Sequence, residues 1–540
     1  MNGLDPAACY RALTTRDARF DGRFFTAVKT TRIYCRPICP ARPPRFENCT
    51  FFPTAAAAQE AGFRPCLRCR PETSPTLAPW RGTSATVSRA MALIADGLLD
   101  ADDASVEVLA ARLGVGGRQL RRLFQQHLGA SPLAVAQTRR VLFARQLIHE
   151  SSLSMGEVAL ASGFGSVRRF NAVFQSLYGR PPGALRRTRA APATSSVPTV
   201  TLLIPYRPPY DWEALMAHLG ARSLTGMEHV ESGRYLRAFS NAWGQGAVEV
   251  SPAPGLDALS ATLRVSDVRM LPSVVAQVRR VFDVGADVEA IHSHLSTDAL
   301  LAPLVTARPG LRAPGGWDGF ELAVRAILGQ QVTVSAARGL GQRLLAVHGE
   351  PLGLELTGDA RLQRAFPRPQ ALATADLTGL GMPAARARTL SHLAAAAAAD
   401  PALFQPGPSL ADTVARFTRL PGIGEWTAQY IALRAVRETD AFPASDVALL
   451  RAATEADGPR PTPEALLQRA EAWSPWRAYA AQHLWTADAT RARTTAAPLA
   501  NASQRKRSPA TPAPASDSTR PVAPAPAKRD AHARTPALLH

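Results

Sequence analysis

The sequence predicts a multidomain, mainly α-helical protein with two small α+β domains and a disordered C-terminal tail. Its 540 residues are enough for three or four domains, each with its own core. Apolar residues recur with helical spacing over residues 85–187 and 304–489, whereas residues 199–265 alternate in the manner of strands. Linker-like stretches at 72–83 and 188–198 separate these regions. We therefore expect domains at 1–75, 84–188, 199–303 and 304–490, and a basic disordered tail at 491–540.

The charge of the chain favours a polyanionic partner. The formal net charge is +19, which is typical of proteins that bind nucleic acid. Nearly all of the positive charge is arginine, since lysine occurs only at Lys29, Lys506 and Lys528. Arginine suits bidentate contacts to phosphate and guanine, but a GC-rich genome produces the same bias. The net charge alone therefore does not distinguish a nucleic-acid-binding protein from the product of a GC-rich genome.

Targeting signals are not found in the sequence. Residues 1–20 lack a basic region followed by an apolar run, and no apolar stretch reaches about 18 residues. Six cysteines are too few for a disulfide framework in a chain of this length. We expect a cytoplasmic protein with no membrane partner, and nothing in the sequence indicates an oligomer, so a monomer is expected.

Four of the six cysteines have the spacing of metal ligands. The pairs are Cys35-x3-Cys39 and Cys66-x2-Cys69, and each can supply two sulfurs from one turn to a tetrahedral zinc ion. On spacing alone, a purely structural zinc is the preferred interpretation. One zinc ion per chain is expected.

The residues around both pairs carry a family resemblance. Residues 30–37 (TTRIYCRP) and 61–71 (AGFRPCLRCRP) resemble the N-terminal domain of the adaptive-response (Ada) proteins. The resemblance implies that Cys35 accepts a methyl group from a DNA methylphosphotriester. Zinc keeps the sulfur deprotonated, and methylation removes a negative charge, which strengthens attraction to phosphate. Cys9 and Cys49 lie outside the cluster and are expected to be ordinary thiols.

Residues 84–188 contain two copies of a helix-turn-helix pattern, at 108–124 and 158–174. Each copy has helical apolar spacing, a glycine at the turn and an arginine-rich second helix. Residues 154–157 predict a capping box before the second copy. The doubling, with residues 178–182 (YGRPP) after it, resembles AraC-type DNA-binding domains. The residues expected to face the major groove or its phosphates are Arg118, Arg122, Arg168, Arg169 and Asn171. The alternative is that these side chains only solvate the helices.

Residues 199–303 predict a small α+β domain without a catalytic constellation. Strands are expected at 199–204, 235–239, 247–250 and 259–265, and amphipathic helices at 210–219 and 271–284. His292 and His294 lie close together without a convincing third ligand, so we expect both at the surface.

The C-terminal helical region contains a glycine-rich turn followed by an aspartate. Helices are expected at 320–328, 334–347 and 384–399. After them, residues 420–424 (LPGIG) permit a tight hairpin in which Gly422 and Gly424 leave backbone N–H groups for a DNA phosphate. By itself this turn supports binding rather than chemistry. Asp446, before the apolar residues 447–450, could equally cap a helix.

Several further motifs extend the resemblance over residues 200–490. They are residues 208–212 (PPYDW), 326–332 (AILGQQV), 380–383 (LGMP) and 476–480 (WRAYA). In order and spacing they resemble the inducible bacterial 3-methyladenine DNA glycosylase of the helix-hairpin-helix superfamily. These enzymes remove damaged bases from DNA.

The resemblance implies roles for individual residues. Asp446 would stabilise the positive charge that develops on the sugar, or orient the attacking water. Trp426, Tyr430 and Trp485 would form an electron-rich pocket for the flipped, often cationic base, although core packing is the commoner fate of any single aromatic. Asp440 is the nearby alternative to Asp446 as the catalytic carboxylate. Trp473 and Trp476 are expected in the core.

Other positions concern the mechanism and the lesion. Relatives that also nick the strand place a lysine where this chain has Trp426, so a monofunctional enzyme is expected. Gln331 occupies the position of an apolar wedge, and His218 replaces an aromatic residue near the pocket. Val447 and Ala448 are smaller than the residues that follow the catalytic aspartate in the resembling family, which suggests a larger base pocket in this protein. The backbone carbonyls implied to hold a monovalent cation beside DNA phosphate are those of Thr418, Leu420 and Ile423.

Together these features predict a fusion of damage sensor, transcriptional regulator and repair enzyme. The expected partners are alkylated and promoter double-stranded DNA, with RNA polymerase as a further candidate. No Pro-Cys-His-Arg motif is present, so the alkylguanine-repair half of the adaptive-response protein is absent. One alternative is a zinc-dependent transcription factor whose C-terminal half binds DNA without catalysis. Another keeps the glycosylase but makes the zinc structural and the helix-turn-helix pair a nonspecific clamp.

Overall fold

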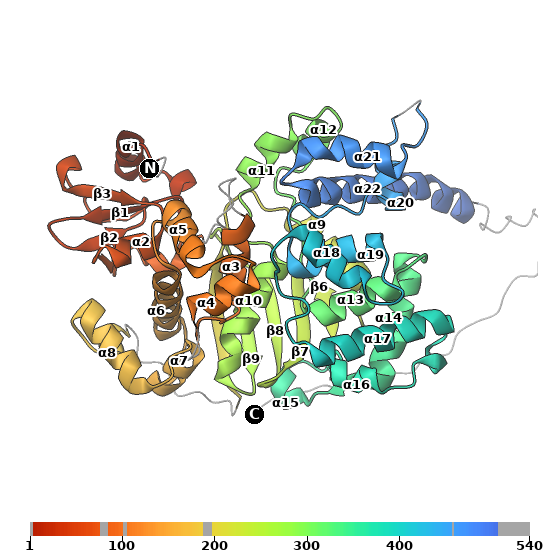
Figure 1. The fold of residues 1–540 in the computed structure, drawn as a ribbon, viewed down its shortest axis with the longest axis horizontal. Coiled ribbons are helices and arrows are strands. Elements are labelled where there is room, and N and C mark those ends of the chain that lie inside the picture. Colours follow the sequence, from red (N-terminus) through yellow and green to blue (C-terminus); the bar gives the residue numbers. More distant parts are fainter. Residues whose placement is uncertain (1–3, 76–84, 101–104, 187–196, 456–457, 506–540) are drawn as a thin grey trace, which may run out of the picture. The chain divides into compact units, whose positions relative to one another are not determined.

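The computed structural model describes residues 4–75, 85–100, 105–186, 197–455 and 458–505. These residues are mainly helical, with a four-stranded sheet near the N-terminus and a five-stranded sheet in the middle of the chain (Figure 1). The chain divides into two compact units, Met1–Ala489 and Thr490–His540. Among the described residues, no helix combines the length and apolarity that crossing a bilayer requires. The predicted fold class is confirmed.

Residues 4–75 form a small α+β fold. The sheet order is β3-β1-β2-β4, in which β2 and β4 are parallel and the other neighbours antiparallel. The side chains of Phe25, Tyr34, Ala58 and Phe63 pack into a core between the sheet and a short helix. The elements are α1 (Pro6–Thr15), β1 (Phe25–Val28), β2 (Ile33–Cys35), β3 (Cys49–Phe52), α2 (Ala55–Glu60) and β4 (Arg64–Pro65). A small core of this kind gains much of its stability from a bound metal.

The next region is all helical and contains both expected helix-turn-helix units. Gly114 and Gly163 occupy the two turns with φ of +66° and +74°, a backbone conformation that favours glycine. The predicted capping box is present, because Ser154 and Glu157 each accept a hydrogen bond from the other's backbone N–H. The helices are α3 (Ala85–Ala95), α4 (Val106–Arg112), α5 (Gly117–Leu128), α6 (Pro132–Glu150), α7 (Met155–Ala161) and α8 (Val167–Tyr178).

A five-stranded antiparallel sheet follows, in the order β5-β9-β8-β7-β6. Four strands and both helices were predicted, whereas β6 was not, because Glu228–Glu231 is short and polar at the sheet edge. The strands are β5 (Thr199–Pro205), β6 (Glu228–Glu231), β7 (Arg234–Asn241), β8 (Gly244–Pro252) and β9 (Ala258–Val265). The helices are α9 (Trp212–Arg222), α10 (Leu271–Val281), α11 (Val288–Leu295) and α12 (Leu301–Ala307).

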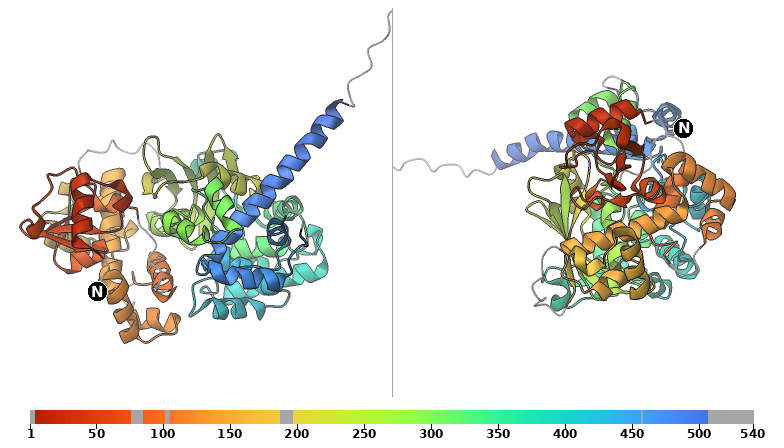
Figure 2. Two further views of the ribbon diagram at one scale, coloured as in Figure 1. Left: turned by 90° about the horizontal axis from the view of Figure 1, so that it is seen from above. Right: turned by 90° about the vertical axis from the view of Figure 1, so that its left-hand side faces the viewer.

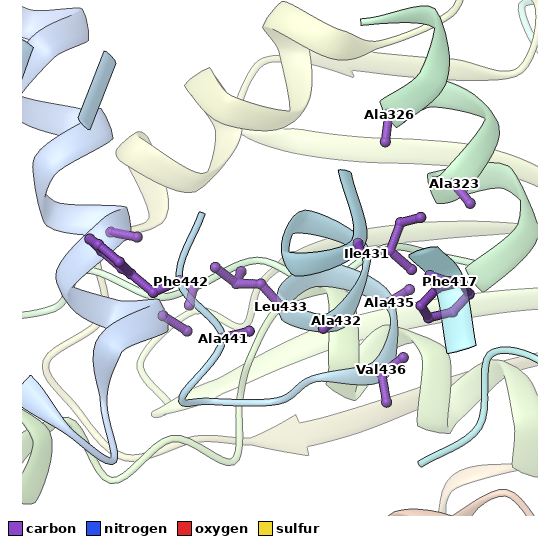
Figure 3. Packing of buried hydrophobic residues seen from close by; sticks show 14 of the residues in the cluster. Ala323, Ala326, Phe417, Ile431, Ala432, Leu433, Ala435, Val436, Ala441 and Phe442 are labelled. Carbon is purple, nitrogen blue, oxygen red and sulfur yellow. The ribbon is translucent and has the colours of Figure 1, made fainter. Parts of the chain in front are cut away.

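The C-terminal helices surround one large apolar core. Figure 3 shows its centre, where Ala323 and Ala326 of α13 lie near Ile431 of α19 and Phe417 of α18. The elements before the hairpin are α13 (Gly319–Leu328), α14 (Val334–His348), β10 (Glu350–Pro351), α15 (Leu354–Thr357), β11 (Arg364–Ala365), α16 (Pro369–Ala373) and α17 (Ala384–Ala399). The hairpin and later helices are α18 (Leu410–Thr418), α19 (Glu425–Ile431), α20 (Val447–Ala452), α21 (Pro463–Ala470) and α22 (Arg477–Arg505).

Two features differ from the sequence prediction. His292 is half-buried rather than fully exposed: its ring packs edge-on against buried His483 of α22, with the centroids 5.5 Å apart. The sequence could not show this contact, because the two residues are brought together only by tertiary packing. Figure 2 shows α22 as one continuous helix that runs past residue 491, where the tail was expected to begin. The segment is rich in alanine and arginine, which are strong helix formers. Residues 506–540 lie outside the described residues, as do most residues of both expected linkers.

Candidate functional site

The carboxylate of Asp446 is held at the start of α20. Its Oδ1 accepts hydrogen bonds from the backbone N–H groups of Ala448, at 2.9 Å, and Leu449, at 3.2 Å. Asp446 is thus the N-cap of this helix, with extended backbone angles. The interpretation of Asp446 as a helix cap is therefore correct.

The same carboxylate also accepts two hydrogen bonds from indoles. The Nε1–H of Trp426, on α19, donates to Oδ2 at 2.9 Å, and that of Trp485, on α22, donates to Oδ1 at 3.0 Å. With the capping amides, four N–H donors surround one carboxylate and fix its orientation. Three helices thus meet at one oriented anion.

Aromatic rings border this anion. Trp426 and Tyr430 are stacked, with centroids 5.4 Å apart and planes 10° apart. Trp485 meets Tyr430 edge-on, with centroids 6.0 Å apart. All three rings are half-buried, in contrast to Trp473 and Trp476, which lie in the core as predicted. The half-buried rings expose electron-rich surface beside the carboxylate.

Asp440, the rival carboxylate, is occupied elsewhere. Its oxygens accept hydrogen bonds from Nε and Nη2 of Arg477, at 2.8 and 2.7 Å, and from Ser474 Oγ at 3.0 Å. Because the Arg477 guanidinium already pairs with it, Asp440 is a structural carboxylate.

The glycine-rich turn joins α18 to α19 as expected. Gly422 has φ of +85°, and a Cβ there would lie 1.9 Å from Thr389 Oγ1, so only glycine fits. Gly424 is the N-cap of α19 and is exposed. Ile423 is buried in the core and anchors the turn. The carbonyl of Leu420 accepts a hydrogen bond from the N–H of Ile423 at 3.1 Å, and Thr418 ends α18.

Gln330 supports this turn and was missed in the sequence. Its Nε2 donates to the carbonyl of Gly422, at 3.1 Å, and to Thr427 Oγ1, at 3.0 Å. Its own carbonyl accepts from Arg386 at 2.6 Å. The adjacent Gln331 is exposed, with φ of +56°, an uncommon conformation for a residue other than glycine. In the sequence, the feature that could have indicated Gln330 was its position next to Gln331, the expected wedge residue.

His218 lies on α9, near the guanidinium group of Arg434, which itself faces the rings of Trp485 and Tyr430. Burial, together with the nearby guanidinium groups of Arg222 and Arg434, lowers the pKa of His218 well below its ordinary value. The imidazole is therefore neutral at physiological pH.

The four clustered cysteines converge. Their Sγ atoms all lie within 4.8 Å of one another, which fits a tetrahedral site with edges of about 3.8 Å for Zn–S bonds of about 2.3 Å. The backbone N–H of Arg36 donates to Cys69 Sγ at 3.3 Å. Cys39, Cys66 and Cys69 are buried, whereas Cys35, at the end of β2, is partly exposed.

The remaining cysteines lie outside this cluster. Cys9 is buried in α1, and Cys49 is half-buried at the start of β3. Neither belongs to the group of potential metal ligands found among the described residues.

The second helix of each helix-turn-helix unit has one apolar and one polar face. Leu120, Phe124 and Leu128 of α5 are buried, as are the corresponding Phe170, Phe174 and Tyr178 of α8. The exposed faces carry the candidate DNA contacts, which are Arg118, Arg122, Arg168, Arg169 and Asn171. The side chains are therefore accessible to a groove.

The fold and these sites define a class of protein: a four-thiolate zinc domain and a double helix-turn-helix region, followed by a helix-hairpin-helix region with an indole-bound carboxylate. Three family models match the chain: "Metal binding domain of Ada" over residues 8–72, "Helix-turn-helix domain" over 109–188, and "AlkA N-terminal domain" over 201–318. The four clustered cysteines lie in the first match and form its zinc-binding site.

Two relatives support the same assignment, and one solved structure shows a weaker likeness. The "Probable bifunctional transcriptional activator/DNA repair enzyme AlkA" of Mycobacterium tuberculosis is 44% identical, over 88% of this chain and 95% of its own length. The "DNA-3-methyladenine glycosylase 2" of Escherichia coli is 35% identical, over 52% of this chain and 95% of its own. The solved 3-methyladenine DNA-glycosylase of Archaeoglobus fulgidus is 21% identical with a TM-score of 0.47, over 53% of this chain and 97% of that one. The chain belongs to the family of bifunctional transcriptional activator/DNA repair proteins of the AlkA type.

Proposed function

We propose that this protein repairs alkylated DNA as a monofunctional N-glycosylase that releases 3-methyladenine and related bases. One observation carries the proposal: a single carboxylate, Asp446, is fixed by two indole N–H groups beside three half-buried aromatic rings. The 35% identity to a DNA-3-methyladenine glycosylase over most of that enzyme's length supports the same activity.

The geometry suggests how the reaction proceeds. The damaged nucleotide leaves the stack, and its base stacks against the rings of Trp426, Tyr430 and Trp485. The bond between C1′ and the base breaks, and the electron pair leaves with the base. Asp446 stabilises the positive charge on the sugar until water adds its oxygen to C1′ and loses a proton. Because four donors already occupy its oxygens, Asp446 acts mainly through its charge rather than as a proton acceptor.

Other residues adapt this site to DNA. Gln331, exposed beside the hairpin, fills the space left by the flipped base, and His218 lines the pocket as a neutral group. Backbone N–H groups at Gly422 and Gly424 contact a phosphate. The backbone carbonyls of Thr418, Leu420 and Ile423 would hold a monovalent cation, whose positive charge would attract a DNA phosphate. No lysine occurs between residues 304 and 490, so no Schiff base forms there and the product is an abasic site.

The N-terminal region supplies a second reaction, transfer of a methyl group to Cys35. When bound, zinc keeps the thiol sulfurs deprotonated. The Cys35 sulfur attacks the methyl carbon of a phosphotriester, an S–C bond forms, and the C–O bond breaks to leave a phosphodiester anion. The partial exposure of Cys35, beside three buried thiols, supports this choice of acceptor. Each protein molecule reacts once.

The helix-turn-helix units bind DNA through α5 and α8, and methylation of Cys35 tunes this binding at promoters, with RNA polymerase as the downstream partner. The competing proposal is a transcription factor whose C-terminal half binds DNA without catalysis. The complete set of Asp446, Trp426, Tyr430 and Trp485 favours catalysis. A base-release assay on methylated DNA separates the two, since only the glycosylase liberates free 3-methyladenine.

A further inference from the structure

Arg434 places a buried guanidinium directly against the proposed base pocket. It lies in a π-helical turn, Ala432–Val436, that continues the helix bearing Trp426 and Tyr430. Its side chain is only 2% exposed. Its Cζ lies 5.0 Å from the ring centroid of Trp485 and 5.9 Å from that of Tyr430. π-helical turns frequently occur at functional sites, because the extra residue redirects a side chain.

The partners of this guanidinium are neutral. Nη1 donates to the carbonyl of Pro314, and Nη2 donates to Gln482 Oε1, both at 2.7 Å. Within the part of the chain that the structure describes, no carboxylate forms an ion pair with it. Arg437, three residues later, differs: it pairs with Asp283 at 2.6 Å. Burial lowers the pKa of Arg434 to about 10, so the group stays charged at neutral pH.

A buried charge without a counterion is costly, and its field reaches further than that of a solvated one. Here the electric field of the Arg434 guanidinium extends across the rings of Trp485 and Tyr430. Trp485 receives the guanidinium over its face and donates its Nε1–H to Asp446 at 3.0 Å. A cation on the face of an indole draws electron density from it, which strengthens the N–H as a donor. The positive charge therefore acts on both the pocket wall and the anion beside it.

The charge of the damaged base changes during its release. A neutral base leaves with an electron pair and gains negative charge in the transition state, which a nearby cation stabilises. A cationic alkylated base arrives positive and becomes neutral, so the same cation opposes its binding. Cationic bases are good leaving groups and tolerate this penalty, whereas neutral ones depend on the pocket.

We propose that Arg434 is a specificity-determining residue that shifts the lesion range from cationic toward neutral damaged bases. This inference rests on the proposed glycosylase activity. It concerns the ratio of kcat/KM values for the two kinds of base, and not the activity itself.

The test compares two oligonucleotide duplexes, one with the neutral deaminated purine hypoxanthine and one with cationic 7-methylguanine. Arg434→Met should raise the ratio of kcat/KM for the cationic base over the neutral one by about 20-fold, as expected for charges about 8–10 Å apart at an effective dielectric of about 20. The KM for the cationic base should fall, since repulsion is removed. Arg434→Lys, which keeps the charge, should leave the ratio near that of the wild type.

A second variant avoids removing the side chain. Gln482→Glu places a carboxylate where Gln482 Oε1 now accepts from Nη2, and so neutralises the guanidinium in place. It should shift the ratio in the same direction. Arg437→Met, which disturbs the same turn but removes a charge that is already paired, should not.

The outcomes separate the inference from the activity on which it rests. If the wild type releases neither base and also liberates no 3-methyladenine from methylated DNA, the proposed function fails. If it liberates 3-methyladenine but neither test base, the inferred lesion range is wrong while the proposed function stands. If the wild type releases both bases, and neither Arg434→Met nor Gln482→Glu changes the ratio, Arg434 does not set specificity. An equal shift in Arg437→Met would assign the effect to the shape of the turn.

Discussion

Asp446 caps a helix and binds two indoles with the same two oxygens, so its structural and functional interpretations do not exclude each other. The capping bonds fix the carboxylate relative to α20, and the indole bonds fix it relative to α19 and α22. A carboxylate held from three sides does not have to reorganise when charge develops beside it, which is the condition for strong electrostatic stabilisation.

Trp485→Phe tests the contribution of one indole donor. The ring is kept and the Nε1–H bond to Asp446 is lost. Because hydrogen bonds to charged groups are worth about 1.5–3 kcal/mol, single-turnover release of 3-methyladenine should slow about 10- to 100-fold. DNA affinity should change little. Trp243→Phe, at an exposed tryptophan of the sheet region, is the control. An unchanged rate would show that the hydrogen bond is irrelevant to the reaction.

The pair of His292 and His483 predicts a pH dependence of stability. Burial lowers the pKa of His292 to about 4 and that of His483 to about 3, against an ordinary value of 6.5. Between pH 6.5 and 4 the unfolded chain binds protons at these rings and the folded chain does not, so stability should fall as pH falls through this range. Melting temperatures from pH 7.5 to 4.5 measure the effect. His483→Asn should flatten the slope, and an unaltered slope would contradict the assignment.

At the scale of elements, the hairpin depends on one glycine more than on the other. Gly422 combines positive φ with close approach to Thr389, whereas a Cβ at Gly424 meets nothing within 4 Å. Gly422→Ala should therefore destabilise the protein by about 1–3 kcal/mol, and Gly424→Ala should be close to neutral. Thermal or urea unfolding of the two variants checks this difference. Equal stabilities would mean that the turn relaxes more easily than its packing suggests.

Sequence patterns predicted the secondary-structure elements better than they predicted the tertiary contacts. Apolar periodicity located the two helix-turn-helix units, the helices at 320–328, 334–347 and 384–399, and four of the five strands of the larger sheet, because burial of one face imposes that period. Edge strand β6 was missed, since its alternation is hidden by charged residues. The π-helical turn was missed as well, because an extra residue in a helix leaves no periodic signal over so few positions.

The same contrast holds for the residues of the site: short-range patterns were predictable from the sequence, whereas tertiary contacts were not. The cysteine spacing, the hairpin and Asp446 could be found in the sequence because each requires particular residue types at short separations. Gln330 and Arg434 could not, since one supports a carbonyl in a distant turn and the other is buried behind two rings. The packing of half-buried His292 against His483 was not predicted, because the two residues are far apart in the sequence.

At the scale of the whole molecule, one chain carries two different responses to alkylation. The zinc region would react once at Cys35, and the C-terminal region would turn over at Asp446. In this proposal, the helix-turn-helix units between them in the sequence would connect damage in the phosphate backbone with gene expression. The 44% identity over 88% of the chain to a bifunctional relative supports treating these regions as one functional protein.

Methyl transfer should be confined to one thiol. After the full chain is incubated with methylphosphotriester DNA, peptide mass spectrometry should find one methyl group on Cys35 and none on Cys39, Cys66 or Cys69, which are buried. Cys49, half-buried and outside the cluster, serves as the internal control. A methyl group on a different cysteine would contradict the assignment of Cys35 as the acceptor, and a methyl group on none would leave the zinc site with a structural role only.

The central claim concerns Asp446, and base release tests it most directly. Asp446→Asn keeps the size of the side chain and an oxygen for the helix cap while removing the charge. Purified wild-type protein should liberate 3-methyladenine from methylated DNA, and Asp446→Asn should melt at a similar temperature yet release the base at least 100-fold more slowly. Release at the wild-type rate by the folded variant, or none by the wild type, would contradict the account.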